Sequence, residues 1–167
     1  MPDLQQELRS RLTGRIVIVG IGNTELGDDA LGVRLAEALN RAGGVEVVIA
    51  GTVPENFVGK IAKGAFDNVL FLDAVEMGSG PGSVALMNAG EIRSRFPQIS
   101  THKFSLGTLA QIIATESKAQ VWLLGVQPAS LALAAPLSEP VKTTMALLGD
   151  LLVEILNDKG SLKPCCR

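Results

Sequence analysis

The sequence predicts a single α/β domain, in which a twisted, mostly parallel five-stranded sheet has helices on both faces. First, short apolar segments alternate along the chain with stretches that repeat apolar residues at helical spacing, as in a sheet with crossover helices. Second, the 167 residues, 47% of them hydrophobic and 19% charged, suit one unit that buries roughly 70% of its unfolded surface. No repeat or long linker divides the chain, so we expect one domain over residues 1–167.

The elements follow in order from the N-terminus. Residues 1–14 begin with a segment too polar for a signal peptide, and we expect an amphipathic helix or a frayed tail there. Strands are predicted at residues 15–19, 45–50, 68–74, 83–87 and 120–126. The first contains a continuous apolar run at 16–19, which is typical of a strand buried on both faces. The fourth closely follows the glycine-rich stretch 78–82, which predicts an antiparallel edge strand returning from a turn.

Helices are predicted at residues 29–41, 54–63, 105–115 and 139–158. Residues 159–167 are expected to form a disordered tail that contains both cysteines, Cys165 and Cys166. Two adjacent thiols exclude a structural disulfide framework, because there is no second pair. Binding of a soft metal or crosslinking by these thiols stays open as an alternative.

The charge balance excludes several classes of partner. The chain has 15 Lys and Arg against 17 Asp and Glu, a pI of about 5.4, and basic residues that are scattered rather than clustered. This composition predicts no binding to nucleic acid or to an anionic membrane. The most apolar window, residues 121–137, is interrupted by polar residues and proline, so it lacks the ~20 apolar residues of a membrane span. We expect a cytoplasmic monomer without membrane insertion.

The loop after the first strand, residues 20–29, resembles a phosphate-binding turn with the wrong charge. A strand, a glycine turn and a helix start ordinarily direct backbone N–H groups at an anion. Here Asp28 and Asp29 occupy the helix start, and Glu25 replaces the third glycine of the dinucleotide pattern. The loop therefore suits a cation, and a nucleotide-binding module is disfavoured. We assign Asp28 to the helix cap and Asp29 to the site.

Two further residues predict a metal site at the same edge of the sheet. Asp73 ends the apolar run 69–72, so it emerges at the carboxyl edge, where ligands gather in open α/β sheets. His102, the only histidine of the chain, lies just before the helix predicted at 105–115. Two carboxylates and an imidazole form a mixed site with open positions that suits Zn or Ni. A Ser-His-Asp triad has little support, since no Gly-x-Ser-x-Gly turn exists.

The walls of a cleft at this edge are predicted from the loops that follow the strands. The candidate substrate-binding residues are Gly22, Asn23, Glu55 and Gln127. Helix initiation explains most of the Pro54-Glu55-Asn56 segment by itself, and an extended turn explains much of the Gln127-Pro128 segment.

These motifs resemble the nickel-iron hydrogenase maturation proteases, endopeptidases that trim a C-terminal extension from the hydrogenase large subunit. The resemblance spans residues 17–152 and rests on the stretches 20–23, 27–32, 54–56, 72–74, 81–82, 101–102 and 125–128. The Gly-Asp-Asp start and the Pro-Glu-Asn segment are most similar to the branch that processes membrane-type, hydrogen-evolving enzymes.

The resemblance implies a metal-contacting trio at Asp29, Asp73 and His102, in which the first position is Glu or Asp across the family. It also implies an aspartic-type endopeptidase whose partner is the nickel-loaded large-subunit precursor. In this interpretation the substrate carries the nickel, its thiolates fill the open positions, and Zn or Cd also fits the site. Asp29 and Asp73 are the candidate general bases. The alternative is a noncatalytic metal-binding chaperone that uses the same trio.

Overall fold

The computed structural model describes residues 3–95 and 105–160 and confirms the predicted single α/β domain. Its five strands are β1 (Ile16–Ile21), β2 (Glu46–Gly51), β3 (Asn68–Ala74), β4 (Val84–Asn88) and β5 (Gln120–Val126). They form one sheet in the order β2-β1-β3-β5-β4. All neighbours pair in parallel except β4, which runs antiparallel to β5 at the edge of the sheet. The sheet is therefore mixed and mostly parallel, and β4 is the predicted returning edge strand.

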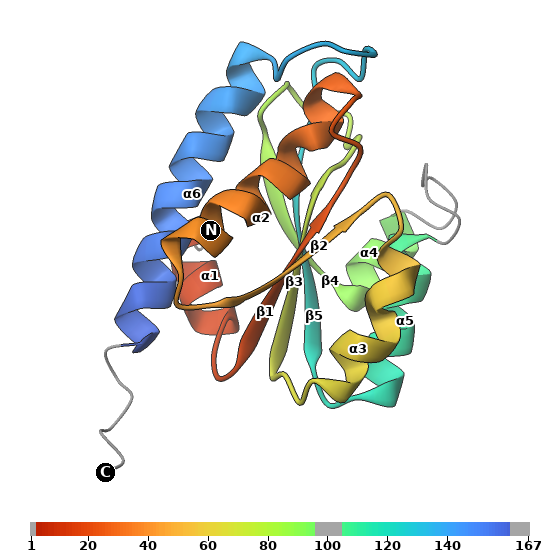
Figure 1. Cartoon of the computed structure of the whole chain (residues 1–167), viewed down its shortest axis with the longest axis vertical. Helices are drawn as coiled ribbons and strands as arrows, with labels where there is room; N and C mark the ends of the chain where they lie inside the picture. The colour runs from red at the N-terminus through yellow and green to blue at the C-terminus, as the bar shows by residue number, and fades with distance from the viewer. Residues whose placement is uncertain (1–2, 96–104, 161–167) are drawn as a thin grey trace.

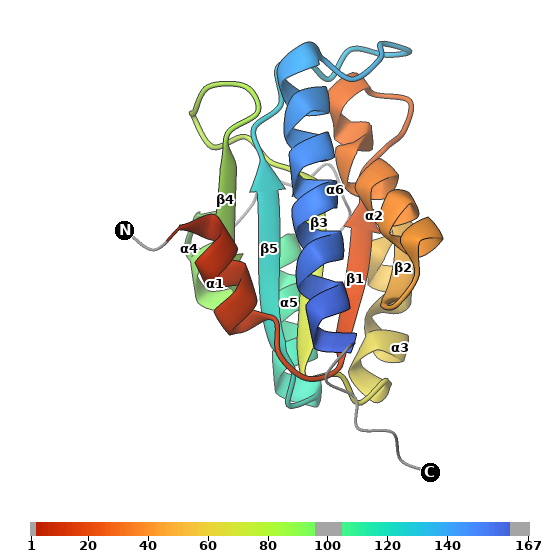
Figure 2. The same cartoon turned by 90° about the vertical axis from the view of Figure 1, so that its left-hand side faces the viewer.

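Helices cover both faces of this sheet, as predicted. They are α1 (Leu4–Arg11), α2 (Leu31–Ala42), α3 (Val58–Lys63), α4 (Ala89–Arg95), α5 (Leu106–Glu116) and α6 (Glu139–Gly160), with 3-10 turns η1 (Gly27–Ala30) and η2 (Pro54–Phe57). In Figures 1 and 2, α1, α2 and α6 lie on one face, and α3, α4 and α5 lie on the other. In the described part of the chain, no helix combines the length and apolar character that crossing a membrane requires.

Each face of the sheet has its own apolar core. Alternate residues of a strand point to opposite faces, so Val17 and Val69 join the core under α3 and α5. Ile18 and Leu70 join the core under α2 and α6. Every residue of β1 is buried, which confirms the strand buried on both faces.

The N-terminal segment forms a helix, one of its two predicted states. Asp3 caps α1 by accepting a hydrogen bond from the Gln5 backbone N–H. Leu8 is fully buried in the core on the α6 side of the sheet. Arg9 forms ion pairs with Glu154 and Asp158 at 2.6 and 2.7 Å. The two cysteines and residues 161–167 lie outside the described residues.

Three helices differ from the sequence-based expectation. The helix predicted at 29–41 starts only at Leu31, because residues 27–30 form the 3-10 turn η1. The helix predicted at 54–63 divides into η2 and α3, because the Asn56 N–H donates to Val53 O in the tighter 3-10 pattern. The helix α4 was not predicted at all, since it is short and its apolar repeat is weak. It is stabilised by reciprocal hydrogen bonds between Asn88 and Glu91, at 2.8 and 2.9 Å, which form a capping box.

Candidate functional site

The carboxyl edge of the parallel strands places two aspartates side by side. The strands β1 and β3 are neighbours in the sheet, and the first turn of α2 packs directly on their ends. This close approach requires Gly32, because a Cβ there would lie 2.1 Å from Leu72 O and 2.3 Å from Ile21 O. The helix start therefore brings Asp29 close to Asp73, at the end of β3.

The carboxylate of Asp29 is buried and held by the turn that follows β1. It is 6% exposed, and its Oδ2 accepts a hydrogen bond of 2.8 Å from the Asn23 backbone N–H. Gly22 has a φ of +137°, and a Cβ there would lie 1.9 Å from Asp29 O. The turn thus needs glycine both for its backbone conformation and for its contact with Asp29.

Asp73 is the most perturbed carboxyl group of the site. It is 5% exposed, and within the described residues its Oδ1 has no hydrogen-bond partner. Burial raises the pKa of Asp73 well above its usual value, the nearby Asp29 charge raises it further, and the Ala74 backbone N–H lowers it. A buried oxygen without a partner, beside a second carboxylate, is a donor set that fits a divalent cation.

The third predicted ligand, His102, lies outside the described residues, so its position relative to the two aspartates stays a prediction. Among residues 3–95 and 105–160, no three His, Cys, Asp or Glu side chains form a group able to hold a metal ion. The described part of the chain therefore supplies two members of the predicted trio.

The assignment of Asp28 to a helix cap was wrong, because neither η1 nor α2 has a side-chain cap. Asp28 is completely buried, and its carboxylate accepts hydrogen bonds from the backbone N–H groups of Ala129, Ser130 and Ser138 at 2.8, 3.1 and 2.7 Å. The Ser138 hydroxyl donates a fourth, at 2.8 Å. Burial by itself raises the pKa of Asp28, but these hydrogen bonds outweigh it and leave the pKa lowered.

Gln127 lies at the same edge, at the end of β5, and is 3% exposed. Its Oε1 accepts from the backbone N–H groups of Met77 and Ser79 at 2.7 and 3.3 Å. Its Nε2 donates to Glu76 Oε1 and Pro128 O at 2.9 and 3.2 Å. Because every hydrogen-bonding position of the amide is used internally, Gln127 holds the loop after β3 in place.

The remaining predicted wall residue, Glu55, lies in η2 after the edge strand β2. Its Oε2 is buried without a hydrogen-bond partner among the described residues. The Gly22 N–H donates to Gly51 O at 3.0 Å, which joins the end of β2 to the turn around Asp29. The structure thus groups Gly22, Asn23, Asp29 and Asp73 closely, with Glu55 in η2 after β2 and Gln127 directly after β5.

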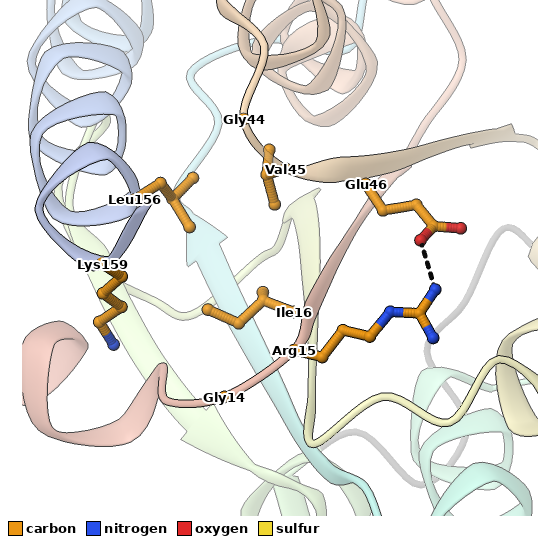
Figure 3. Close-up of a pocket in the computed structure, with 8 residues that line it drawn as sticks. All are labelled: Gly14, Arg15, Ile16, Gly44, Val45, Glu46, Leu156 and Lys159. Carbon is orange, nitrogen blue, oxygen red and sulfur yellow. Dashed lines mark hydrogen bonds and ion pairs between the residues drawn. The ribbon is translucent and has the colours of Figure 1, made fainter. Parts of the chain in front are cut away.

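A separate cavity of about 650 Å³ lies at the amino ends of β1 and β2 (Figure 3). Its lining includes Arg15 and Glu46, which form a 3.0 Å ion pair with each other. Because it opens at the opposite end of the strands from Asp29 and Asp73, it is not part of the acidic site.

Together, the fold and the site define an α/β protein with paired buried carboxylates at the carboxyl edge of its sheet, suited to bind a cation or activate water. The HycI family, described as "Hydrogenase maturation protease", matches residues 30–155. Hydrogenase 3 maturation protease of Escherichia coli is 31% identical over 128 residues, which cover 75% of this chain and 81% of that protein. The chain belongs to this family of hydrogenase maturation proteases, which confirms the predicted enzyme class, an endopeptidase.

Further hydrogenase maturation proteases are similar to this chain in sequence and in structure. A putative hydrogenase maturation protease of Methanocaldococcus jannaschii is 30% identical over 154 residues, covering 86% of this chain and 89% of that protein. The crystal structure of the [NiFe] hydrogenase maturation protease HycI from Thermococcus kodakarensis superposes with a TM-score of 0.78 at 36% identity. The superposed region covers 90% of this chain and 99% of the chain from Thermococcus kodakarensis.

Proposed function

We propose that this endopeptidase removes a C-terminal extension from the large-subunit precursor of a nickel-iron hydrogenase after nickel has been inserted. Family membership supports the class of reaction. The observation that supports the site is the buried pair of Asp29 and Asp73, in which one Asp73 oxygen has no partner among the described residues. A substrate that brings its own cation to this pair would relieve the repulsion between the carboxylates.

In this proposal, nickel is part of the substrate and is recognised by Asp29, Asp73 and His102. Three protein ligands leave coordination positions open, which ligands from the precursor would fill. Zn or Cd would occupy the same oxygen and nitrogen donors. A bound divalent ion supplies Lewis-acid stabilisation of charge that develops on a carbonyl oxygen.

The chain's own contribution to hydrolysis is proton transfer by a carboxylate. We assign this role to Asp29 or Asp73, both of which are buried at the site. The base takes a proton from the water that attacks the scissile carbonyl, and it returns a proton to the departing amine. Asn23 positions Asp29 for this step, because its backbone N–H donates a hydrogen bond to Asp29 Oδ2. Gly22 permits the close contact between the turn and Asp29.

Intact-mass measurement of a nickel-loaded precursor, with and without the purified protease, tests the proposal. The wild-type protein should release one C-terminal peptide. Asp29→Asn and Asp73→Asn should each slow release about 100-fold or more, since general acid–base groups contribute on that scale. His102→Ala should also slow release strongly, because it removes one of the three proposed nickel ligands. Asp150→Asn, an exposed aspartate of α6, is the matched control and should retain full activity.

Full activity in all three site variants would refute the assignment of the site. Binding of the loaded precursor without loss of any peptide would instead indicate the noncatalytic metal-binding chaperone. The cytoplasmic location and the monomeric state stay predictions, to be tested by cell fractionation and sedimentation.

A further inference from the structure

The segment between β5 and α6 presents apolar side chains to solvent beside the acidic site. This segment, residues 127–138 and called here the β5–α6 loop, contains no charged residue. Residues 129–134 are all exposed, with Leu131 at 46% and Leu133 at 74%. Figure 1 shows the loop at the top of the molecule, next to the start of α2. Apolar side chains exposed together in this way are typical of an interaction surface.

The backbone of this loop is nevertheless firmly attached to the turn that contains the site. Besides accepting the hydrogen bonds to its carboxylate, Asp28 donates its own N–H to Ser130 O at 3.0 Å. The Ala134 N–H donates to Glu25 O at 2.7 Å, and Leu26 and Leu133 form an antiparallel bridge. Gly27 permits the close approach, because a Cβ there would lie 2.7 Å from Ser130 O.

An ordered backbone with exposed apolar side chains is preorganised for binding. Folding of the chain has already fixed the loop, so a partner that covers the leucines does not have to order its backbone. The loop also lies close to the reacting groups, because its anchor Asp28 directly precedes Asp29 in the chain. An extended peptide advances about 3.3 Å per residue, so a few residues span the path from Asp29 to the loop.

We propose that Leu131 and Leu133 bind the substrate polypeptide, through an extended, uncharged and apolar segment close to its scissile bond. This inference rests on the proposed function, in which a polypeptide has to pass the carboxylates of Asp29 and Asp73. The uncharged loop matches such a segment, because a charged one would lose water on contact without gaining an opposite charge. The surface thus contributes to substrate affinity, separately from recognition of nickel.

Cleavage kinetics with Leu133→Glu test this surface. Leu147→Glu is the matched control, because Leu147 is also a leucine with high exposure, 66%, but lies on α6 outside the loop. With the nickel-loaded precursor, Leu133→Glu should raise KM about tenfold or more and leave kcat unchanged, since removing one central apolar contact weakens binding on that scale. Leu147→Glu should match the wild type. Thermal unfolding should show the same Tm for both variants, because neither side chain is buried.

An unchanged KM for Leu133→Glu, or an equal rise in both variants, would overturn the inference. A dimer in sedimentation that Leu133→Glu dissociates would also overturn it, because the loop would then join two copies of the chain. If the wild-type protein fails to cleave the precursor, the proposed function fails, and the surface is tested by binding alone. In that case a tenfold weaker Kd for Leu133→Glu supports the docking surface, and an equal Kd refutes it.

Discussion

The Asp28→Ala variant removes the carboxylate that joins η1 to the β5–α6 loop and leaves four donor groups without their acceptor. The two donors of Ser138 are partly buried, so each loss costs about 1 kcal/mol. The N–H groups of Ala129 and Ser130 lie on exposed residues where water replaces the carboxylate, at about 0.5 kcal/mol each. The free energy of unfolding should therefore fall by about 3 kcal/mol, which lowers Tm by about 9 °C for a chain of this length.

The loss of stability is measured by urea unfolding of the wild type, Asp28→Ala, Ser138→Ala and the double variant, which together form a double-mutant cycle. Ser138→Ala removes only the hydroxyl bond and should cost about 1 kcal/mol in the wild-type protein, but almost nothing in the Asp28→Ala background. The pKa of folded Asp28 is lowered, so its stabilisation is complete above the ordinary carboxyl pKa and is lost as pH falls through the folded-state value. The difference in the free energy of unfolding between the wild type and Asp28→Ala should therefore become smaller at acid pH. The reasoning would be refuted if Asp28→Ala lowered the free energy of unfolding by less than about 1 kcal/mol at pH 7. It would also be refuted if the costs of Asp28→Ala and Ser138→Ala simply added in the double variant.

Two further changes, at Asp73 and Gly32, test the edge of the sheet, and a third, at Gly59, is the control for Gly32. Because burial and Asp29 raise the pKa of Asp73 in the folded state, stability falls as pH rises between the unfolded and folded pKa values. In metal-free buffer, Asp73→Asn should therefore be more stable than wild type at pH 8 and similar at pH 3 in urea titrations; a less stable variant at pH 8 would contradict this. Gly32→Ala should cost about 3 kcal/mol in the same assay, because its Cβ meets Leu72 O at 2.1 Å. Gly59 lies in α3 with open space around it, so Gly59→Ala should raise the free energy of unfolding by about 0.5–1 kcal/mol. Equal changes in stability for Gly32→Ala and Gly59→Ala would refute the packing argument.

Much of the fold was predictable because local patterns determine it. The strands at 68–74 and 120–126 were predicted with their observed bounds, since both are apolar runs between turn signals. The antiparallel direction of β4 followed from the short glycine-rich connection before it. The helix α4 was missed because its stability depends on one capping pair and on packing of Ile92, which is fully buried.

The site was predictable only in part. Asp29 and Asp73 were selected as candidates because one lies in the loop after the first predicted strand and the other lies at the end of the third. The sheet order places these two strands side by side, but the role of the two carboxylates stays a prediction. The role of His102 stays a prediction, because the residue lies outside the described part of the chain.

The sequence by itself determined the class of fold and the family of the protein, because periodicity and short motifs are local properties. Only the tertiary structure decided the roles of Asp28 and Gln127. The hydrogen-bond partners of Asp28 lie 101 to 110 residues further along the chain, and the Gln127 amide reaches back about 50 residues to the loop after β3. The residues next to Asp28 in the sequence do not indicate whether its carboxylate caps the nearby helix or binds a segment far along the chain. That choice depends on which segments the folded sheet brings within hydrogen-bond distance.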